Sequence, residues 1–231
     1  MAEHPEANAS ISFVPAPFLL DAALEAIDSG ISIYVMVTDL VPFLDAVRII
    51  NFAERGGVQV IGPNTAGVTS PGKCKLGIHP VHLIKPGSVG VMSRSGGLSY
   101  EMAAELTYRE IGQSTLVDIG GDPVVGMGFG ELIRMYEEDR DTEVMVMLGE
   151  VGGTAEEEAA EIIRKEVSKP VVALIVGRQA PPGKRMGHAG AIVMERMGTA
   201  NSKIEALRRA EVYIAKHIRE VSEHCEKILR R

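Results

Sequence analysis

The chain has 231 residues, and its 24 basic and 31 acidic side chains give a formal charge of −7. This acidic balance argues against a nucleic-acid partner or an anionic membrane partner, because both need a basic surface. No apolar run approaches the ~20 residues that a membrane-spanning helix needs, and the acidic first residues do not fit a secretory signal. The two cysteines, Cys74 and Cys225, belong to no CxxC motif or Cys/His cluster. We therefore expect a reduced, cytoplasmic protein with no metal site of its own.

Short apolar runs rich in Val and Ile alternate with amphipathic stretches along the chain. Runs that are apolar on both faces are typical of buried parallel strands, and their alternation with helices predicts an α/β fold with right-handed crossovers. We expect strands over 11–14, 31–37, 58–61, 89–92, 115–119, 144–148 and 171–176, and helices over 18–29, 42–55, 98–110, 129–139, 155–167 and 202–209. Thr154, with Glu157 three residues later, predicts a capping box at the start of the fifth helix.

Residues 62–87 interrupt this alternation. They contain four prolines among several glycines and show no clear period, which predicts a linker or an excursion between two units. We place the boundary near residue 80, which gives units at 1–80 and 81–231. The first unit has only about three expected strands, so we expect part of its domain to be missing from the N-terminal side.

The last thirty residues, 202–231, carry eight basic and five acidic side chains, in contrast to the acidic remainder. Residues 212–215 predict a short edge strand. Apolar residues from Ile214 to Ile228 then follow helical spacing. We expect a terminal helix that packs on the sheet rather than one that binds a partner.

Four expected strand ends in the second unit are rich in glycine. They lie at 93–97, 120–123, 149–153 and 187–190. The carboxyl ends of parallel strands open on one edge of the sheet, where α/β proteins bind ligands. These four loops therefore predict a single site.

The first of these loops reads Ser93-Arg-Ser-Gly-Gly97 and leads directly into a helix. Such a loop is either a phosphate cradle or a plain capped turn. As a cradle, the backbone N–H groups of Gly96 and Gly97 would bind the anion at the positive end of the helix dipole. The hydroxyls of Ser93 and Ser95 would add donors. The loop is not a P-loop, because GxxxxGK[ST] does not occur in the chain.

His188 lies in a long glycine-rich loop with Lys184 and Arg185 close in sequence. A lone histidine is most often a surface residue or a hydrogen-bonded structural group, and the alternatives here are a general base, a nucleophile or a metal ligand. Small neighbours leave the ring accessible, and the positive charges suit a histidine that accepts a phosphoryl group. Glu150, at the end of an adjacent expected strand, could hold the far ring nitrogen and fix the tautomer. We interpret the histidines at 4, 79, 82, 217 and 224 as structural.

Four motifs together resemble a known family. They are Gly-Pro-Asn at 62–64, Ser-Arg-Ser-Gly-Gly-Leu-Ser-Tyr-Glu at 93–101, Gly-Glu-Val-Gly-Gly-Thr-Ala-Glu-Glu-Glu at 149–158 and Gly-Lys-Arg-Met-Gly-His-Ala-Gly at 183–190. In this order they resemble the α subunits of succinyl-CoA synthetases, within the NDP-forming acyl-CoA synthetases. The resemblance implies part of a Rossmann-like CoA-binding domain, followed by a flavodoxin-like ligase domain with a parallel sheet.

The resemblance also implies roles for particular residues. His188 matches the histidine that is transiently phosphorylated, and Glu150 matches the glutamate that hydrogen-bonds it. The loop with Ser93, Ser95, Gly96 and Gly97 matches the helix N-terminus that holds the phosphohistidine. Tyr100 matches a substrate-binding tyrosine, and Val37, Thr38 and Asp39 match a segment that contacts CoA.

The implied reaction is succinate + CoA + NTP ⇌ succinyl-CoA + NDP + phosphate. The chain lacks nucleotide-binding motifs, so the resemblance places ATP or GTP, with Mg²⁺, on a separate β subunit in an αβ heterodimer or α2β2 heterotetramer. Two alternatives remain at this stage. One is a malate–CoA or related carboxylate–CoA ligase, and the other is a non-catalytic structural or regulatory paralogue. A nicotinamide-dependent oxidoreductase is disfavoured, because no GxGxxG follows an early strand.

Overall fold

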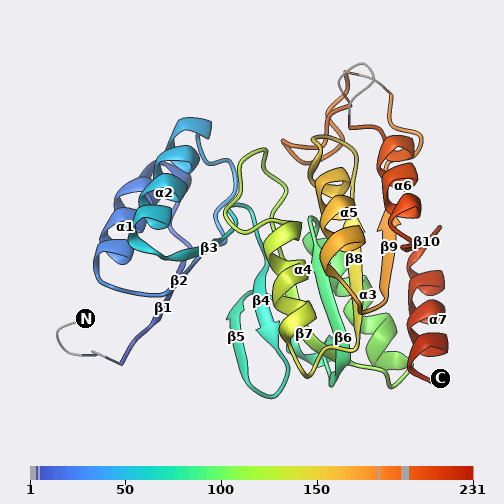
Figure 1. Cartoon of the computed structure of the whole chain (residues 1–231). Coiled ribbons are helices and arrows are strands. Elements are labelled where there is room, and N and C mark those ends of the chain that lie inside the picture. The colour runs from blue at the N-terminus through green and yellow to red at the C-terminus, as the bar shows by residue number, and fades with distance from the viewer. Residues whose placement is uncertain (1–3, 5, 182, 194–197, 231) are drawn as a thin grey trace.

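The computed structural model describes residues 4, 6–181, 183–193 and 198–230, which form two sheets with helices packed on them (Figure 1). The strands are β1 (Ala9–Ser12), β2 (Ile33–Met36), β3 (Gln59–Ile61), β4 (Gly67–Ser70), β5 (Cys74–Gly77), β6 (Pro86–Ser93), β7 (Gln113–Asp118), β8 (Val144–Gly149), β9 (Val171–Ile175) and β10 (Tyr213–Ala215). The helices are α1 (Ala16–Asp28), α2 (Phe43–Gly56), α3 (Gly96–Tyr108), α4 (Phe129–Glu138), α5 (Ala155–Glu166), α6 (Ala200–Arg209) and α7 (Ile218–Leu229), with a 3-10 turn η1 (Val81–Leu83). Every expected strand and helix is present, with ends shifted by a few residues.

The smaller sheet has three parallel strands in the order β1-β2-β3. Helices α1 and α2 pack on each other and on one face of this sheet, where Leu19, Tyr34 and Ile49 are buried together. Strand β2 is buried through Tyr34, Val35 and Met36, as the apolar run predicted. This unit is a parallel α/β layer.

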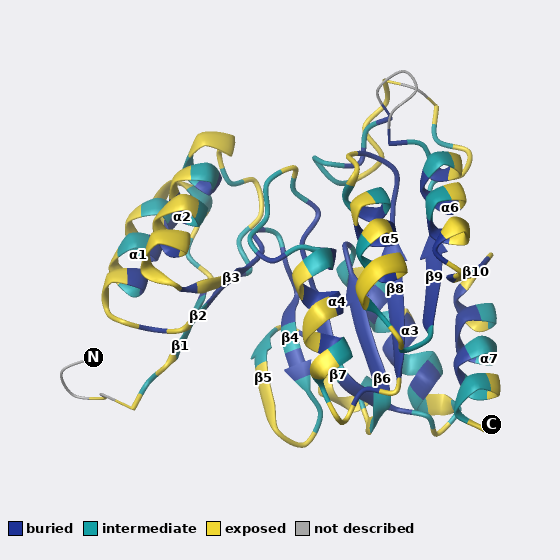
Figure 2. Ribbon diagram, in the orientation of Figure 1, coloured by how far each residue is buried: buried dark blue, intermediate teal, exposed yellow. Residues whose placement is uncertain are grey.

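The larger sheet has seven strands in the order β10-β9-β8-β6-β7-β4-β5. Strands β6 to β10 are parallel, and in chain order their arrangement is 2-1-3-4-5, the flavodoxin-like topology. Figure 2 shows β8 and β9 as buried strands between helices, whereas β10 at the edge is more exposed. Because both faces are covered, all six residues of β8 are buried, which explains its uninterrupted apolar sequence.

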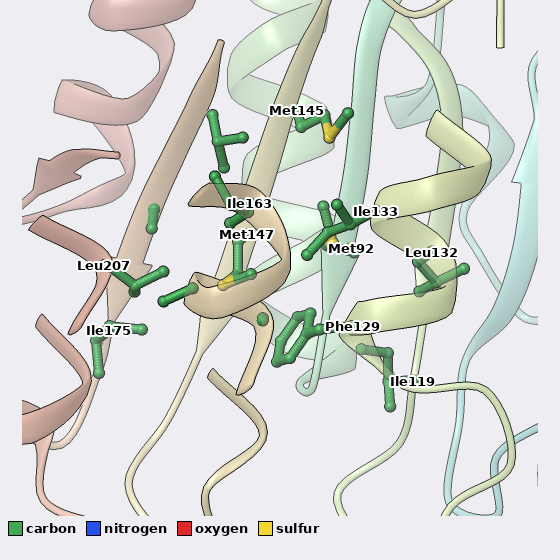
Figure 3. Close-up of a cluster of buried hydrophobic side chains, with 14 of the residues drawn as sticks. Met92, Ile119, Phe129, Leu132, Ile133, Met145, Met147, Ile163, Ile175 and Leu207 are labelled. Atoms are coloured by element: carbon green, nitrogen blue, oxygen red, sulfur yellow. The ribbon is translucent and has the colours of Figure 1, made fainter. Parts of the chain in front are cut away.

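Helices α4, α5 and α6 cover one face of the larger sheet, and α3 and α7 cover the other. Figure 3 shows the core on the first face, where Phe129 and Ile133 of α4 pack against Met92 and Met147 of the central strands. The methionines fill space among branched side chains in a chain that contains no tryptophan.

The two sheets are connected by the loop that follows β7. In this loop Gly126 donates to the Gly62 carbonyl (2.9 Å), and Met127 donates to the Val60 carbonyl (2.7 Å). Met127 also shares a core with Val35 and Ile61, which point away from α1 and α2. The loop therefore covers the second face of the small sheet.

The structure corrects two sequence expectations. Residues 62–87 are not only a linker, because β4 and β5 form an antiparallel hairpin that extends the larger sheet next to β7. The capping box at Thr154 does not form, since Glu157 contacts Lys203 instead. The edge strand predicted over 212–215 is present as β10 and contains Ile214, so the terminal helix begins only after it.

The division at residue 80 remains a prediction. The pairing of β4 with β7 favours a boundary before residue 67. None of the described helices is both long and apolar enough to cross a membrane.

The hairpin depends on Gly67, which faces Gly77 across the strands at a φ of 95°. A Cβ at Gly67 would collide with the Leu76 carbonyl oxygen, whereas Gly30 has a similar φ of 87° and open space around it. We expect Gly30→Ala to cost about 1 kcal/mol through backbone strain alone. Gly67→Ala should cost about 1–3 kcal/mol more through the collision. Urea unfolding of the two variants measures the difference, and equal losses would contradict the steric argument.

Candidate active site

The site lies where the chain order of the larger sheet reverses. Strands β6 and β8 are neighbours, but the helices that follow them, α3 and α5, lie on opposite faces of the sheet. The loops after such strands separate and leave a crevice at their carboxyl ends, which is where open α/β sheets bind ligands. Arg94 follows β6 and Glu150 follows β8, so both side chains start at this crevice.

His188 reaches the crevice from the loop after β9. Its Nδ1 lies 3.0 Å from Oε1 and 2.9 Å from Oε2 of Glu150. A carboxylate can only accept, so Nδ1 carries the hydrogen and the lone pair of the neutral ring is on Nε2. Glu150 is buried, whereas the His188 side chain remains 29% exposed. The pair thus presents an oriented imidazole with an available nitrogen.

The pKa of His188 is raised above its ordinary value. The hydrogen bond to Glu150 is the largest cause, and partial burial opposes it. The Glu150 and Asp122 charges raise this pKa further, while Arg94 lowers it. The ring therefore becomes neutral, and nucleophilic, at a higher pH than an isolated histidine does.

Arg94 contacts the Glu150 side of this pair and is only 8% exposed. Its Nη2 lies 3.5 Å from Glu150 Oε1, and its Nη1 donates to the Gly152 carbonyl (3.1 Å). The Nη1 also lies 3.5 Å from Oε1 of the fully buried Glu156. Sequence reasoning missed both Arg94 and Glu156. The signal was the arginine between two serines at a strand end, in a loop where only the hydroxyls and glycines were considered.

Two glycines let the histidine loop close on this site. Gly190 donates to the Gly121 carbonyl (3.0 Å), which fixes the loop to the end of β7. A Cβ at Gly190 would lie 2.8 Å from Nη2 of Arg94, and one at Gly121 would strike the His188 ring. Three of the four glycine-rich loops, at 120–123, 149–153 and 187–190, are therefore in direct contact, as their positions predicted.

The fourth loop is linked to His188 through Arg94. In this loop the buried Ser93 hydroxyl donates to the Ser95 carbonyl (2.8 Å) and accepts from the Ser95 N–H (3.0 Å). Ser95 precedes α3 as its N-cap, and Gly96 and Gly97 form the first turn, with Gly97 exposed. Because the turn uses the Ser93 hydroxyl and the Ser95 N–H, the donors left at this helix end are the N–H groups of Gly96 and Gly97 and the Ser95 hydroxyl. Phosphate binding by these four residues remains a prediction.

Tyr100 lies in the same first part of α3 and is partly buried. Its ring meets His79 edge-on, with centroids 5.8 Å apart and planes at 84°. Burial raises the pKa of the Tyr100 hydroxyl, and the nearby Asp118 charge raises it further. The phenol therefore stays protonated and can donate a hydrogen bond. His79 is fully buried between Thr69 and Asp118, which fits its interpretation as structural.

The segment 37–39 meets the histidine loop across a cavity of about 470 Å³. Asp39 lines one side of this cavity, and Arg185, Gly187 and His188 line the other. Thr38 is held in place by its hydroxyl, which donates to the Val14 carbonyl (2.7 Å). Val37, Thr38 and Asp39 also line a second cavity of about 650 Å³ beside the start of α1. The structure thus connects the predicted CoA segment with the predicted nucleophile.

Within the described part of the chain, no group of three or more His, Cys, Asp or Glu side chains could hold a metal ion. Two acidic side chains at the crevice, Glu150 and Glu156, are paired with Arg94, Lys203 and His188.

Comparison with known proteins decides the family. Residues 92–213 match the family model described as CoA-ligase. The chain is 50% identical over 224 residues to the succinate–CoA ligase [ADP-forming] subunit alpha 2 of Archaeoglobus fulgidus, covering 97% of this chain and 78% of that protein. It is 49% identical to the corresponding alpha subunit of Aquifex aeolicus, over 97% of this chain and 74% of the relative.

The chain belongs to the family of succinate–CoA ligase α subunits. The resemblance inferred from the four motifs is therefore confirmed.

A solved structure shares the fold of the whole chain. ATP citrate lyase from Methanothrix soehngenii, in complex with citrate and coenzyme A, superposes with a TM-score of 0.89 at 26% identity. The match covers 100% of this chain but only 41% of that chain. The two-sheet arrangement thus recurs as part of a longer chain, in a structure that contains coenzyme A.

Glu150→Gln tests the electrostatics of the pair. The variant removes the charge that raises the pKa of His188, so we expect the titration midpoint of the ring to move to lower pH, toward the ordinary value. NMR of the imidazole C–H signals, assigned with a His188→Asn variant, measures it. Glu143→Gln, exposed at the opposite end of β8, is the control and should leave the midpoint unchanged. An unmoved midpoint in Glu150→Gln would contradict the assigned contact.

Gly121→Ala tests the packing of the loop. The added methyl group would occupy the position of the His188 ring, so we expect the ring to leave Glu150 while the fold is kept. The imidazole signals should move toward those of an exposed histidine. In Gly56→Ala the new methyl group meets only ordinary contacts at 3.7 Å, so this variant is the control. Wild-type signals in Gly121→Ala would show that the ring does not depend on this glycine.

Proposed function

We propose that this chain is the α subunit of a succinate–CoA ligase and carries the phosphoryl group on His188. The observation that supports this most directly is the contact between both Glu150 oxygens and Nδ1, which leaves Nε2 available beside a cavity. The family relatives are named as ADP-forming enzymes, which favours ATP as the phosphoryl donor. Their names do not favour the malate alternative. The intact His188–Glu150 pair argues against a non-catalytic paralogue.

In the first step the neutral His188 attacks the terminal phosphorus of ATP through Nε2, the bond to ADP breaks, and a phosphohistidine forms. The attack places positive charge on the ring. Glu150 stabilises this charge and keeps the Nδ1 hydrogen in place, so no proton has to be relocated before transfer. Phosphoryl transfer depends mainly on positioning and charge, which a fixed imidazole supplies.

In the second step a succinate carboxylate oxygen attacks the phosphohistidine and forms succinyl phosphate, which restores the neutral ring. The CoA thiolate then attacks the acyl carbon and releases inorganic phosphate. We assign the phosphate at this stage to the backbone N–H groups of Gly96 and Gly97 and to the Ser95 hydroxyl at the start of α3. Ser93 supports that turn through its hydroxyl, and the protonated Tyr100 is placed to donate to the substrate.

We assign the CoA thiol to the cavity between Asp39 and His188 and the adjoining part of CoA to Val37 and Thr38. Support comes from the overlapping positions of the two cavities along this segment and from the ATP citrate lyase structure, which contains coenzyme A. In this assignment residues 1–80 contribute to CoA binding, and residues 81–231 form the ligase domain.

We propose that ATP and Mg²⁺ bind to a β subunit, in an αβ or α2β2 complex, and that this subunit approaches the exposed side of the His188 loop. The alpha-subunit names of the relatives support such a partner. We also propose a cytoplasmic location, which suits the two free cysteines, exposed Cys74 and buried Cys225.

His188→Asn tests the nucleophile. With the β subunit, Mg²⁺ and γ-labelled ATP, the wild-type chain should acquire acid-labile, base-stable phosphate, and the variant should acquire none because the attacking nitrogen is gone. Phosphoprotein labelling measures this. His82→Asn is the control, since His82 lies in η1, away from the site, and should leave labelling intact. Labelling of His188→Asn would show that another residue accepts the phosphate.

A further inference from the structure

A fully buried lysine stands at the far end of a chain of charged contacts that leads to His188. Lys203 of α6 is 0% exposed. Its Nζ donates to the Gly153 carbonyl (2.9 Å) and to Glu157 Oε2 (3.0 Å), and it forms an ion pair with Glu156 Oε2. A buried ammonium group is costly unless it is paired, so these contacts hold it firmly.

Glu156 connects this lysine to the active site. Its second oxygen, Oε1, accepts from the Glu150 backbone N–H (3.1 Å) and lies 3.5 Å from Nη1 of Arg94. Glu156 is itself fully buried at the start of α5. It therefore fixes the backbone of the residue whose side chain holds the histidine.

Arg94 is shared between two carboxylates at equal distance. Its guanidinium lies 3.5 Å from Glu156 Oε1 and 3.5 Å from Glu150 Oε1. If Glu156 lacked another cation, Arg94 would be its only compensating charge and would be drawn away from Glu150. Lys203 supplies that other cation, so the buried group contains two positive and two negative side chains in balance.

We propose that Lys203 is a positioning residue for His188. By pairing with Glu156, it leaves Arg94 available to Glu150 and keeps the Glu150 carboxylate aligned on Nδ1. The inference rests on the proposed function only in naming His188 as the phosphoryl acceptor, since the contacts themselves belong to this chain. It extends the active site to a helix whose sequence gave no functional signal.

If Lys203 served only as a structural staple, meaning an ion pair that holds α6 against α5, a different titration of His188 would be expected. A staple affects stability but leaves the charge around His188 unchanged. The charged groups that shift the pKa of His188 are Glu150, Asp122 and Arg94, while Asp39 and Arg185 line the cavity beside the ring. Of these groups, Arg94 lowers the histidine pKa. Withdrawal of Arg94 toward Glu156 would therefore raise that pKa. The titration of His188 thus separates positioning from stapling.

The experiment is an NMR titration of the full chain with ¹⁵N-labelled histidine, without a partner subunit. It compares the wild type, Lys203→Met, Glu156→Gln and the double variant. We expect Lys203→Met to raise the His188 midpoint by about one pH unit. In the Glu156→Gln background, where no charge remains to attract Arg94, the same substitution should have no effect. Lys165→Met, an exposed lysine of α5 paired with Glu161, is the control and should leave the midpoint unchanged.

Two results would overturn the proposal. An unchanged midpoint in Lys203→Met would make the lysine a staple, and an equal shift in both backgrounds would mean a direct field that bypasses Glu156. If Lys203→Met alone does not fold, Glu156→Gln decides the matter. It frees Arg94 for Glu150 and should lower the midpoint, and an unchanged midpoint there overturns the proposal as well.

Labelling of the assembled αβ complex keeps the two proposals distinguishable. A folded Lys203→Met should accept phosphate about 100-fold more slowly than the wild type, because its histidine is misplaced. If the wild type itself accepts no phosphate, the proposed function fails, while the NMR titration still judges the role of Lys203.

Discussion

The contact between Glu150 and Nδ1 of His188 is the interaction on which the proposed chemistry of this chain depends. It selects the tautomer and orients the ring, and in the proposed mechanism it would stabilise the charge that forms when Nε2 accepts the phosphoryl group. A carboxylate buried to this degree is stable only with compensating charge, and Arg94 provides it. The reactive nitrogen thus sits at the end of a buried charge network while its own side chain stays partly exposed.

The fold places this network at a position that a flavodoxin-like sheet leaves open. Helices α3 and α5 diverge from neighbouring strands, so the loops after β6 and β8 bring Arg94 and Glu150 together at the crevice. The third loop can close over them only because Gly121 and Gly190 carry no side chains. The sequence placed the loops of these two glycines at one site without a role for either residue, and the structure shows that they leave space for the histidine ring and for Arg94.

The sequence was sufficient for much of this account, and the reasons are physical. Strands buried on both faces produce continuous apolar runs, so the parallel sheets could be predicted. His188 and Glu150 could be paired because both follow strands that end on one edge. The β4–β5 hairpin was missed because its short strands are rich in glycine and polar residues and have no clear period.

Arg94, Glu156 and Lys203 were missed for another reason. Their roles arise from contacts between residues far apart in the chain, such as Lys203 and Glu156, which local patterns do not encode. Thr154 and Glu157 show the converse, because a local capping pattern is overridden by the tertiary contact of Glu157 with Lys203.

The most direct test of the central claim is to locate the phosphate on the ring. The complex with the β subunit would be phosphorylated by ATP, and ³¹P NMR of the denatured chain would distinguish the two phosphohistidine isomers. Because Glu150 occupies Nδ1, we predict phosphate on Nε2 of His188. Phosphate on Nδ1, or on another residue, would contradict the account.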